Sequence, residues 1–69
     1  MLKERKKIIE FKEYDKVKTL VKKDVYPEGT IGIIVSFYSG SDYCEVELWD
    51  TDGDPVDVVT YETKDLELI

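Results

Sequence analysis

The chain has 69 residues, a formal net charge of −6 and a hydrophobic fraction of 42%. This length permits one domain with a small core. One cysteine and no histidine exclude an internal disulfide, Cys–His nucleophilic chemistry and ordinary zinc sites within one chain. No apolar run is long enough to span a membrane or to form the core of a secretion signal. We therefore expect a cytoplasmic protein that needs no cofactor.

The charges are divided unevenly along the chain. Residues 1–23 carry nine Lys/Arg and four Asp/Glu, a net of +5, whereas residues 24–69 carry one Lys and twelve Asp/Glu, a net of −11. An acidic body repels phosphate backbones and attracts basic surfaces. The alternative is that the acidic residues only keep a small protein soluble.

Residues 1–13 are expected to form a basic arm, followed by one domain over residues 14–69. Lys and Glu favour one or two helical turns here, and a frayed end is the alternative. Ile8, Ile9 and Phe11 are apolar enough to anchor the arm on the domain. The basic cluster is either a nucleic-acid contact or a solvated tail, and consists of Lys3, Arg5, Lys6 and Lys7.

Two strands are predicted before residue 40. Asp15–Lys23 alternates, with Val17, Thr19 and Val21 on one face and a basic, wet face opposite. Pro27 and Gly29 predict a loop at residues 24–29. Thr30–Tyr38 is the most strand-like run of the chain. The residues expected on one face are Ile31, Ile33, Val35 and Phe37, and those expected on the other are Gly32, Ile34, Ser36 and Tyr38. Gly32 predicts a bulge or a close backbone approach, and Ile34 suggests that its face is partly covered as well.

The next run, Tyr43–Trp49, alternates apolar and polar residues as a strand with one buried face does. Residues 39–42 are turn-forming, so these two strands form an antiparallel hairpin. The residues expected to point inward are Cys44, Val46 and Leu48. Those expected to point outward are Tyr43, Glu45, Glu47 and Trp49.

The remaining residues predict a second hairpin and a short closing strand. Asp52-Gly53 lies in a turn before the strand Val56–Tyr61, in which Val59 and Tyr61 resemble core and Asp57 resembles surface. Residues 62–65 predict one turn of 3₁₀ helix, and residues 66–69 a final strand. Five short strands without a long amphipathic helix favour an all-β fold, a small five-stranded barrel.

Several segments resemble a family of small bacterial domains of unknown function with SH3-like barrels. They are VKTL, PEGTIGIIV, YCEVELWD, TDGDP and KDLELI, and the resemblance covers Tyr14–Ile69. Gly29 and Gly32 are also similar to the turn and strand of KOW-type barrels, which differ from this chain in being basic where they meet RNA. The family brings no activity with it. Similar small domains occur near polymorphic toxins, which implies an immunity or antitoxin role.

No catalytic or metal-binding constellation is predicted. The acidic stretch from Asp50 departs from an EF-hand loop, because Pro55 stands where the glycine is needed and Tyr61 where the glutamate is needed. A hairpin turn is the better interpretation. Cys44 lies on the inward side of its strand and is expected to be a small buried hydrophobe. No spacing selects a pair of carboxylates for acid–base catalysis, so we do not expect an enzyme.

Exposed aromatics flanked by carboxylates are typical of a protein-binding surface. The candidate partner-binding residues are Tyr43, Glu45, Glu47, Trp49, Asp50, Asp52, Asp54 and Asp57. The alternative is that Trp49 is buried at the end of the barrel and the acids are only solvated. The first functional hypothesis is an immunity or antitoxin protein that covers the active site of a basic toxin, such as a nuclease. The second is a KOW-like module that binds nucleic acid or ribosomes, and the third is an assembly subunit that dimerises through a strand edge.

Overall fold

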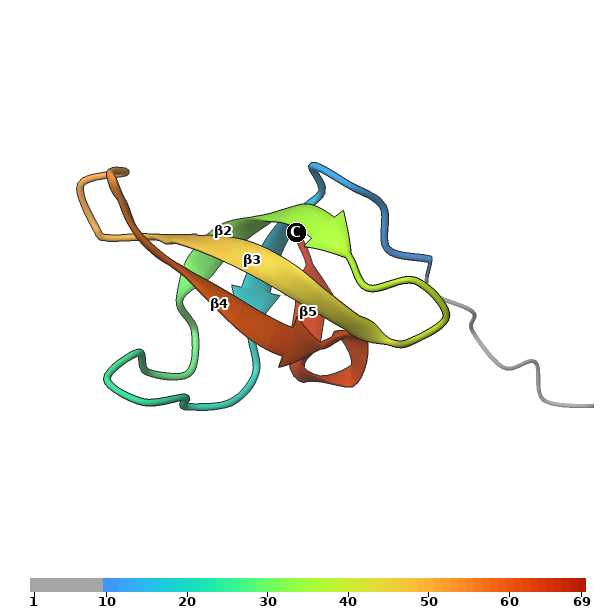
Figure 1. Ribbon diagram of the computed structural model, residues 1–69. Helices are drawn as coiled ribbons and strands as arrows, with labels where there is room; N and C mark the ends of the chain where they lie inside the picture. The colour runs from blue at the N-terminus through green and yellow to red at the C-terminus, as the bar shows by residue number, and fades with distance from the viewer. Residues whose placement is uncertain (1–9) are drawn as a thin grey trace, which may run out of the picture.

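The computed structural model describes residues 10–69 and consists of five strands and one turn of 3₁₀ helix (Figure 1). The elements in chain order are β1 (Lys16–Thr19), β2 (Ile31–Phe37), β3 (Tyr43–Trp49), β4 (Pro55–Glu62), η1 (Thr63–Asp65) and β5 (Leu66–Leu68). The predicted all-β, five-stranded fold is therefore confirmed, as is the 3₁₀ turn before the last strand.

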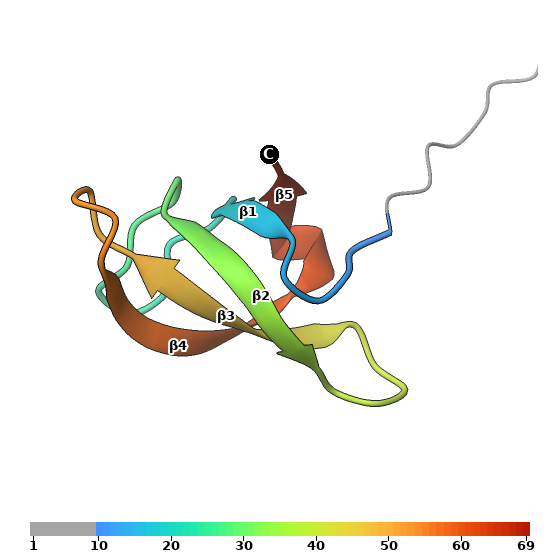
Figure 2. The same ribbon diagram turned by 90° about the horizontal axis from the view of Figure 1, so that it is seen from above.

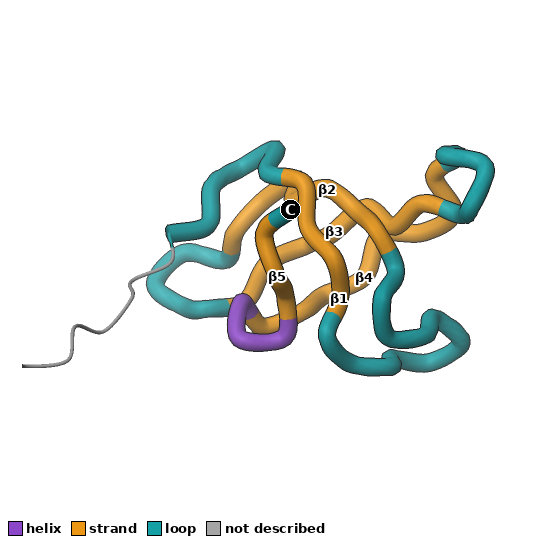
Figure 3. Tube along the Cα trace, turned by 180° about the vertical axis from the view of Figure 1, so that it is seen from behind, coloured by secondary structure: helices purple, strands orange, loops and turns teal. Residues whose placement is uncertain are grey.

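All strand pairs are antiparallel, and the sheet order is β4-β3-β2-β1-β5. The sheet is strongly bent, so that its two ends curve toward each other around the core (Figure 2). β4 and β5 are the edges of this order and are joined in sequence through η1, visible in Figure 3. The bent sheet therefore encloses the core although β4 and β5 do not pair with each other.

The core consists of inward-facing residues from all five strands, and the alternation of β3 supplies three of them. Its buried apolar residues are Val17, Ile34, Cys44, Val46, Leu48, Tyr61 and Leu66. The predicted inward set of β3 is fully buried. In β4, Tyr61 is buried, Val59 packs partly against the core and Asp57 is exposed, as the sequence predicted.

Gly32 lies where two strands approach closely. A Cβ at this position would stand 2.6 Å from the Glu47 carbonyl oxygen and 2.8 Å from Val46 Cγ1, so no other residue fits without a shift. The register of β2 against β3 also shifts between Ile34 and Ser36. Ile34 is fully buried. The close approach predicted at Gly32 is thus confirmed. The face of Gly32 and Ile34, which was expected to be only partly covered, is the core face of β2, whereas Ile31, Ile33 and Val35 on the other face are half-buried.

The first strand is shorter than predicted. It ends at Thr19, whereas the alternation of the sequence continues to Val21. Beyond Thr19, the Leu20 amide donates (2.8 Å) to the carbonyl of Asp65, a residue of η1 and not of a strand. Lys23 and Tyr26 then exchange two backbone hydrogen bonds of 2.9 Å around their own tight turn. The β1–β2 connection therefore spans residues 20–30.

This connection covers part of the free edge of β4. Lys23 Nζ donates to the Thr60 carbonyl and lies 5.1 Å from the centroid of the Tyr61 ring. The Asp57 carboxylate accepts the Val58 amide of the same strand (2.8 Å). Two backbone groups of the edge are thus satisfied by side chains, which discourages pairing with another strand.

At the N-terminal end, Phe11 packs against the core, as predicted. The expected helix or frayed end, Ile8, Ile9 and the cluster from Lys3 to Lys7 lie outside the described residues. Within residues 10–69, the only helix is the three-residue η1, and none has the length and apolar character to cross a membrane.

Candidate functional site: an acidic, aromatic hollow between two loops

The outer face of β3 carries the four predicted residues, but two of them are engaged within the fold. Glu45 is half-buried and accepts hydrogen bonds from the Thr60 hydroxyl (3.1 Å to each carboxylate oxygen) and from the Tyr38 hydroxyl. Glu47 is also half-buried and accepts the Trp49 indole N–H (3.0 Å). Both carboxylates are therefore hydrogen-bonded to neighbouring side chains of the sheet in addition to carrying negative charge.

Tyr43 lies apart from the rest of the predicted set. It is 46% exposed and pairs with Glu62, whereas Trp49, at the other end of β3, pairs with Pro55. A strand of this length separates its two ends by about 20 Å. The predicted patch is therefore two separate surfaces, and Tyr43 belongs to the end with the β2–β3 loop.

The β3–β4 hairpin concentrates negative charge at the opposite end of the sheet. Asp50 Oδ1 accepts the backbone amides of Asp52 and Asp54, both at 2.9 Å, and Gly53 takes a φ of +84°. All three aspartates are exposed. Asp50 therefore stabilises the turn by accepting backbone amides, as in an Asx turn. The carboxylates of Asp52 and Asp54 lie exposed on the surface. The predicted hairpin turn is confirmed.

The β1–β2 connection lies beside this hairpin, and both project from the same end of the sheet (Figures 1 and 3). Thr19 fixes the connection: its buried hydroxyl donates to the Pro27 carbonyl (3.3 Å) and accepts the Thr30 amide (3.0 Å). The backbone of Thr19 also bonds to Thr30 and to Gly29, at 2.9 and 2.7 Å. The C-terminal part of the β1–β2 connection is thus fixed to the end of β1.

A hydrogen bond between side chains ties the β1–β2 connection to β4. The Tyr26 hydroxyl donates to Asp57 Oδ2 (2.7 Å), and this bond to a carboxylate raises the pKa of Tyr26 above its usual value. The phenol consequently stays protonated and remains a donor throughout the physiological range. The hydrogen bond to Asp57 therefore fixes the orientation of the Tyr26 ring.

Between the two loops lies a hollow of about 450 Å³. Its apolar part is formed by the rings and aliphatic groups of Tyr26, Pro27, Ile31, Trp49 and Val56. Glu28 and Asp50 supply two carboxylates to its lining, which contains no Lys or Arg. The hollow therefore combines flat aromatic surfaces with uncompensated negative charge.

The structure thus brings together part of the predicted site and adds residues to it. Trp49, Asp50 and Asp57 meet at the hollow or its rim, and Asp52 and Asp54 lie on the hairpin above it. The residues that sequence reasoning missed are Tyr26, Pro27, Glu28, Ile31 and Val56. A signal was present, because an aromatic residue before a proline in a glycine-containing loop is an ordinary feature of binding loops.

The single thiol of the chain, Cys44, is buried. Burial raises the pKa of the Cys44 thiol to about 11, so the thiol is protonated and shielded at neutral pH. No group of three or more acidic or Cys side chains within residues 10–69 is placed to hold a metal ion. The aspartates of the hairpin are arranged around backbone amides, as the Asp50 bonds illustrate.

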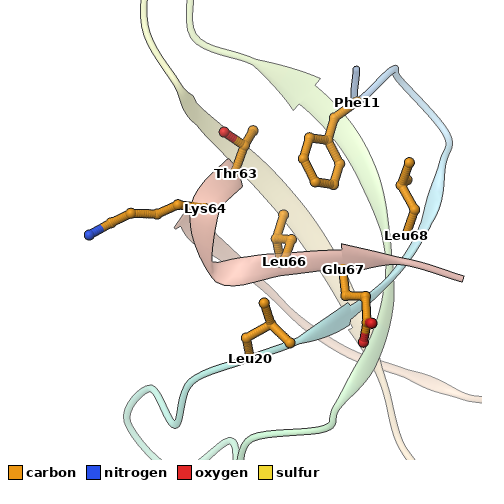
Figure 4. A pocket seen from close by; sticks show the side chains of 7 residues that line it. All are labelled: Phe11, Leu20, Thr63, Lys64, Leu66, Glu67 and Leu68. Atoms are coloured by element: carbon orange, nitrogen blue, oxygen red, sulfur yellow. The ribbon is translucent and has the colours of Figure 1, made fainter. Parts of the chain in front are cut away.

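A larger hollow, of about 680 Å³, lies against β5 on another side of the molecule (Figure 4). Its lining is Phe11, Leu20, Thr63, Lys64, Leu66, Glu67 and Leu68. The charges of Lys64 and Glu67 balance there. We assign no ligand to this hollow, because its two opposite charges favour neither an anionic nor a cationic ligand.

Comparison of the chain with protein-family models, with curated proteins and with solved structures gave no match. Function is therefore inferred from the geometry and charge of the hollow and of the hairpin beside it.

Proposed function

We propose that the protein is a non-catalytic binding module that takes a basic protein partner at the end of the sheet formed by the β1–β2 connection and the β3–β4 hairpin. The observation that carries the proposal is the hollow, in which Tyr26 and Trp49 stand beside Glu28 and Asp50 without any cation. Aromatic residues supply much of the energy of protein interfaces, and surrounding carboxylates steer a basic partner toward them.

The biological role that we propose is that of an immunity or antitoxin protein in the cytoplasm. A toxin that acts on nucleic acid needs a positively charged cleft, and an acidic protein can block such a cleft by occupying it. The net charge of −11 over residues 24–69 supports this role. Inhibition would be steric and electrostatic and would need no reaction on this chain.

The KOW-like, nucleic-acid-binding alternative has weaker support from the lysines of the first strand and its loop. Lys18 forms an ion pair with Glu67 (3.4 Å), and Lys23 is engaged with the Thr60 carbonyl and the Tyr61 ring. Only Lys16 and Lys22 of the proposed basic strand remain exposed without such a contact within residues 10–69. Two charges on this strand give little attraction for a phosphate backbone. The basic cluster from Lys3 to Lys7, on which this alternative also rests, lies outside the described residues.

The test is purification of the tagged protein from its native host at low salt, followed by salt titration of any complex. We expect a basic protein in one-to-one ratio, with affinity that falls as salt rises. Asp54→Lys should weaken the complex at least tenfold. The matched control is Asp42→Lys, which makes the same charge change in the β2–β3 loop at the opposite end and should leave affinity within about twofold. Equal effects of the two variants, or recovery of RNA instead of protein, would contradict the proposal.

A further inference from the structure

We propose that the hollow between the loops binds the side chain of an arginine that the partner presents. This inference rests on the proposed function and makes it more specific, because it names the anchor group and its receptor. The residues that form the receptor are Tyr26, Trp49, Asp50 and Glu28, and Ile31 and Val56 also line the hollow.

The walls of the hollow suit the flat faces of a guanidinium group and the aliphatic stem below it. Tyr26 and Trp49 come from segments that are far apart in sequence, yet both line the hollow. A guanidinium stacks on aromatic faces and is more weakly hydrated than an ammonium group. Ile31, Pro27 and Val56 provide apolar surface for the three methylenes of an arginine.

The orientation of the two aromatic residues is fixed before a partner arrives. The Trp49 indole N–H donates to Glu47 (3.0 Å), and the Tyr26 hydroxyl donates to Asp57 (2.7 Å). The polar groups of both aromatic side chains are thus hydrogen-bonded to carboxylates. Receptor groups that are already ordered lose little side-chain entropy on binding, which favours affinity.

A carboxylate is also available for the charge of the ligand. Asp50 uses Oδ1 for both amides of the hairpin turn, and Oδ2 accepts no hydrogen bond from any residue between 10 and 69. Glu28 is exposed in the loop on the other side of the hollow. The fork of a guanidinium can donate two parallel bonds to a carboxylate while its flat face lies on a ring, whereas a lysine ammonium binds as a point charge.

The hollow is large enough for an arginine side chain. Its volume of about 450 Å³ lies within the range of small-ligand sites, roughly 300–1,000 Å³, so neighbouring atoms of the partner also have room. Anionic ligands such as nucleotides are disfavoured, because the lining has two carboxylates and no cation. Charge complementarity therefore selects a basic side chain.

The test uses Trp49, the only tryptophan of the chain, as the reporter. The full-length protein is titrated with the capped peptide acetyl-Gly-Arg-Gly-amide, and the indole N–H cross-peak and the indole fluorescence are followed. The lysine peptide tests the preference for a guanidinium, and the citrulline peptide, of nearly the same shape but uncharged, tests the need for charge. We expect a saturable shift with arginine, binding at least fivefold weaker with lysine, and no saturation with citrulline.

Asp50→Asn separates charge from folding, because the amide oxygen of asparagine can still accept the two backbone amides of the turn. It should weaken binding of the arginine peptide at least fivefold without changing the melting temperature by more than a few degrees. Asp42→Asn, which removes the same charge at the opposite end, should bind as the wild type does. An unsaturable titration, equal binding of the lysine or citrulline peptide, or wild-type binding by Asp50→Asn would overturn the arginine site. Capture of a basic partner that remains sensitive to Asp54→Lys would then leave the proposed function standing.

Discussion

Replacement of Thr19 by valine tests how the loop that carries Tyr26 is held. The Thr19 side chain is fully buried, and its hydroxyl bonds to the Pro27 carbonyl at 3.3 Å and to the Thr30 amide at 3.0 Å. Valine keeps the β-branched shape and removes both bonds. A buried polar group that is left without a partner costs about 1–3 kcal/mol.

We therefore expect Thr19→Val to lower the free energy of unfolding by about 2 kcal/mol. A chain of this size has a total stability of roughly 3–10 kcal/mol, so the variant should melt about 8–16 °C lower. Affinity for the arginine peptide should fall as well, because Tyr26 loses its support. Urea unfolding, followed by the fluorescence of Trp49, measures the change in stability, and we expect the m-value of the variant to equal that of the wild type.

The control for this prediction is Thr30→Val. The Thr30 hydroxyl donates to the same Pro27 carbonyl at 2.6 Å, but this bond is exposed to solvent. Water can replace it, so the loss should stay below about 0.5 kcal/mol. Equal losses in the two variants, or a loss below about 0.5 kcal/mol for Thr19→Val, would refute the view that the buried hydroxyl organises the loop.

Three further predictions concern the core. Gly32→Ala places a methyl 2.6 Å from the Glu47 carbonyl oxygen and should lower the free energy of unfolding in urea by about 1–3 kcal/mol. The control Gly53→Ala has open space around the added methyl and should lower it only by the roughly 1 kcal/mol that a φ of +84° costs. A smaller loss of stability at Gly32 than at Gly53 would contradict this. The buried Tyr61 hydroxyl has no hydrogen-bond partner within residues 10–69, so Tyr61→Phe should be at least as stable as the wild type in thermal melting, and a loss above about 1 kcal/mol would be inconsistent with that geometry. Burial raises the pKa of Cys44 from 9.0 to about 11, so the folded state holds this proton more tightly than the unfolded state does. The resulting stability is complete below pH 9 and is lost as pH rises toward about 11, and Cys44→Ala should flatten this part of the stability profile measured by urea unfolding.

Local alternation was sufficient to predict most of the strands. In β3, the period of two places Cys44, Val46 and Leu48 in the core, because a strand has only two faces and one of them is apolar. The end of β1 could not be predicted in the same way. The alternation continues to Val21, but the strand stops where the Leu20 amide bonds to Asp65, a residue 45 positions away.

The candidate site was predicted only where it follows one strand or one turn. Trp49 and the aspartates of the hairpin were recognised from local pattern and charge. Tyr26 was missed because its role depends on a hydrogen bond to Asp57, 31 residues further along the chain. Conversely, Tyr43 was grouped with Trp49 because they share a face of β3, but the length of the strand places them on separate surfaces.

If the end of the sheet with the hollow meets a basic partner, binding will slow hydrogen exchange there. We would measure hydrogen exchange of the protein alone and in the complex purified from the host. We expect protection on binding to be strongest at residues 26–31 and 49–56. Protection confined to β5 and the β2–β3 loop, with residues 26–31 and 49–56 unchanged, would contradict it.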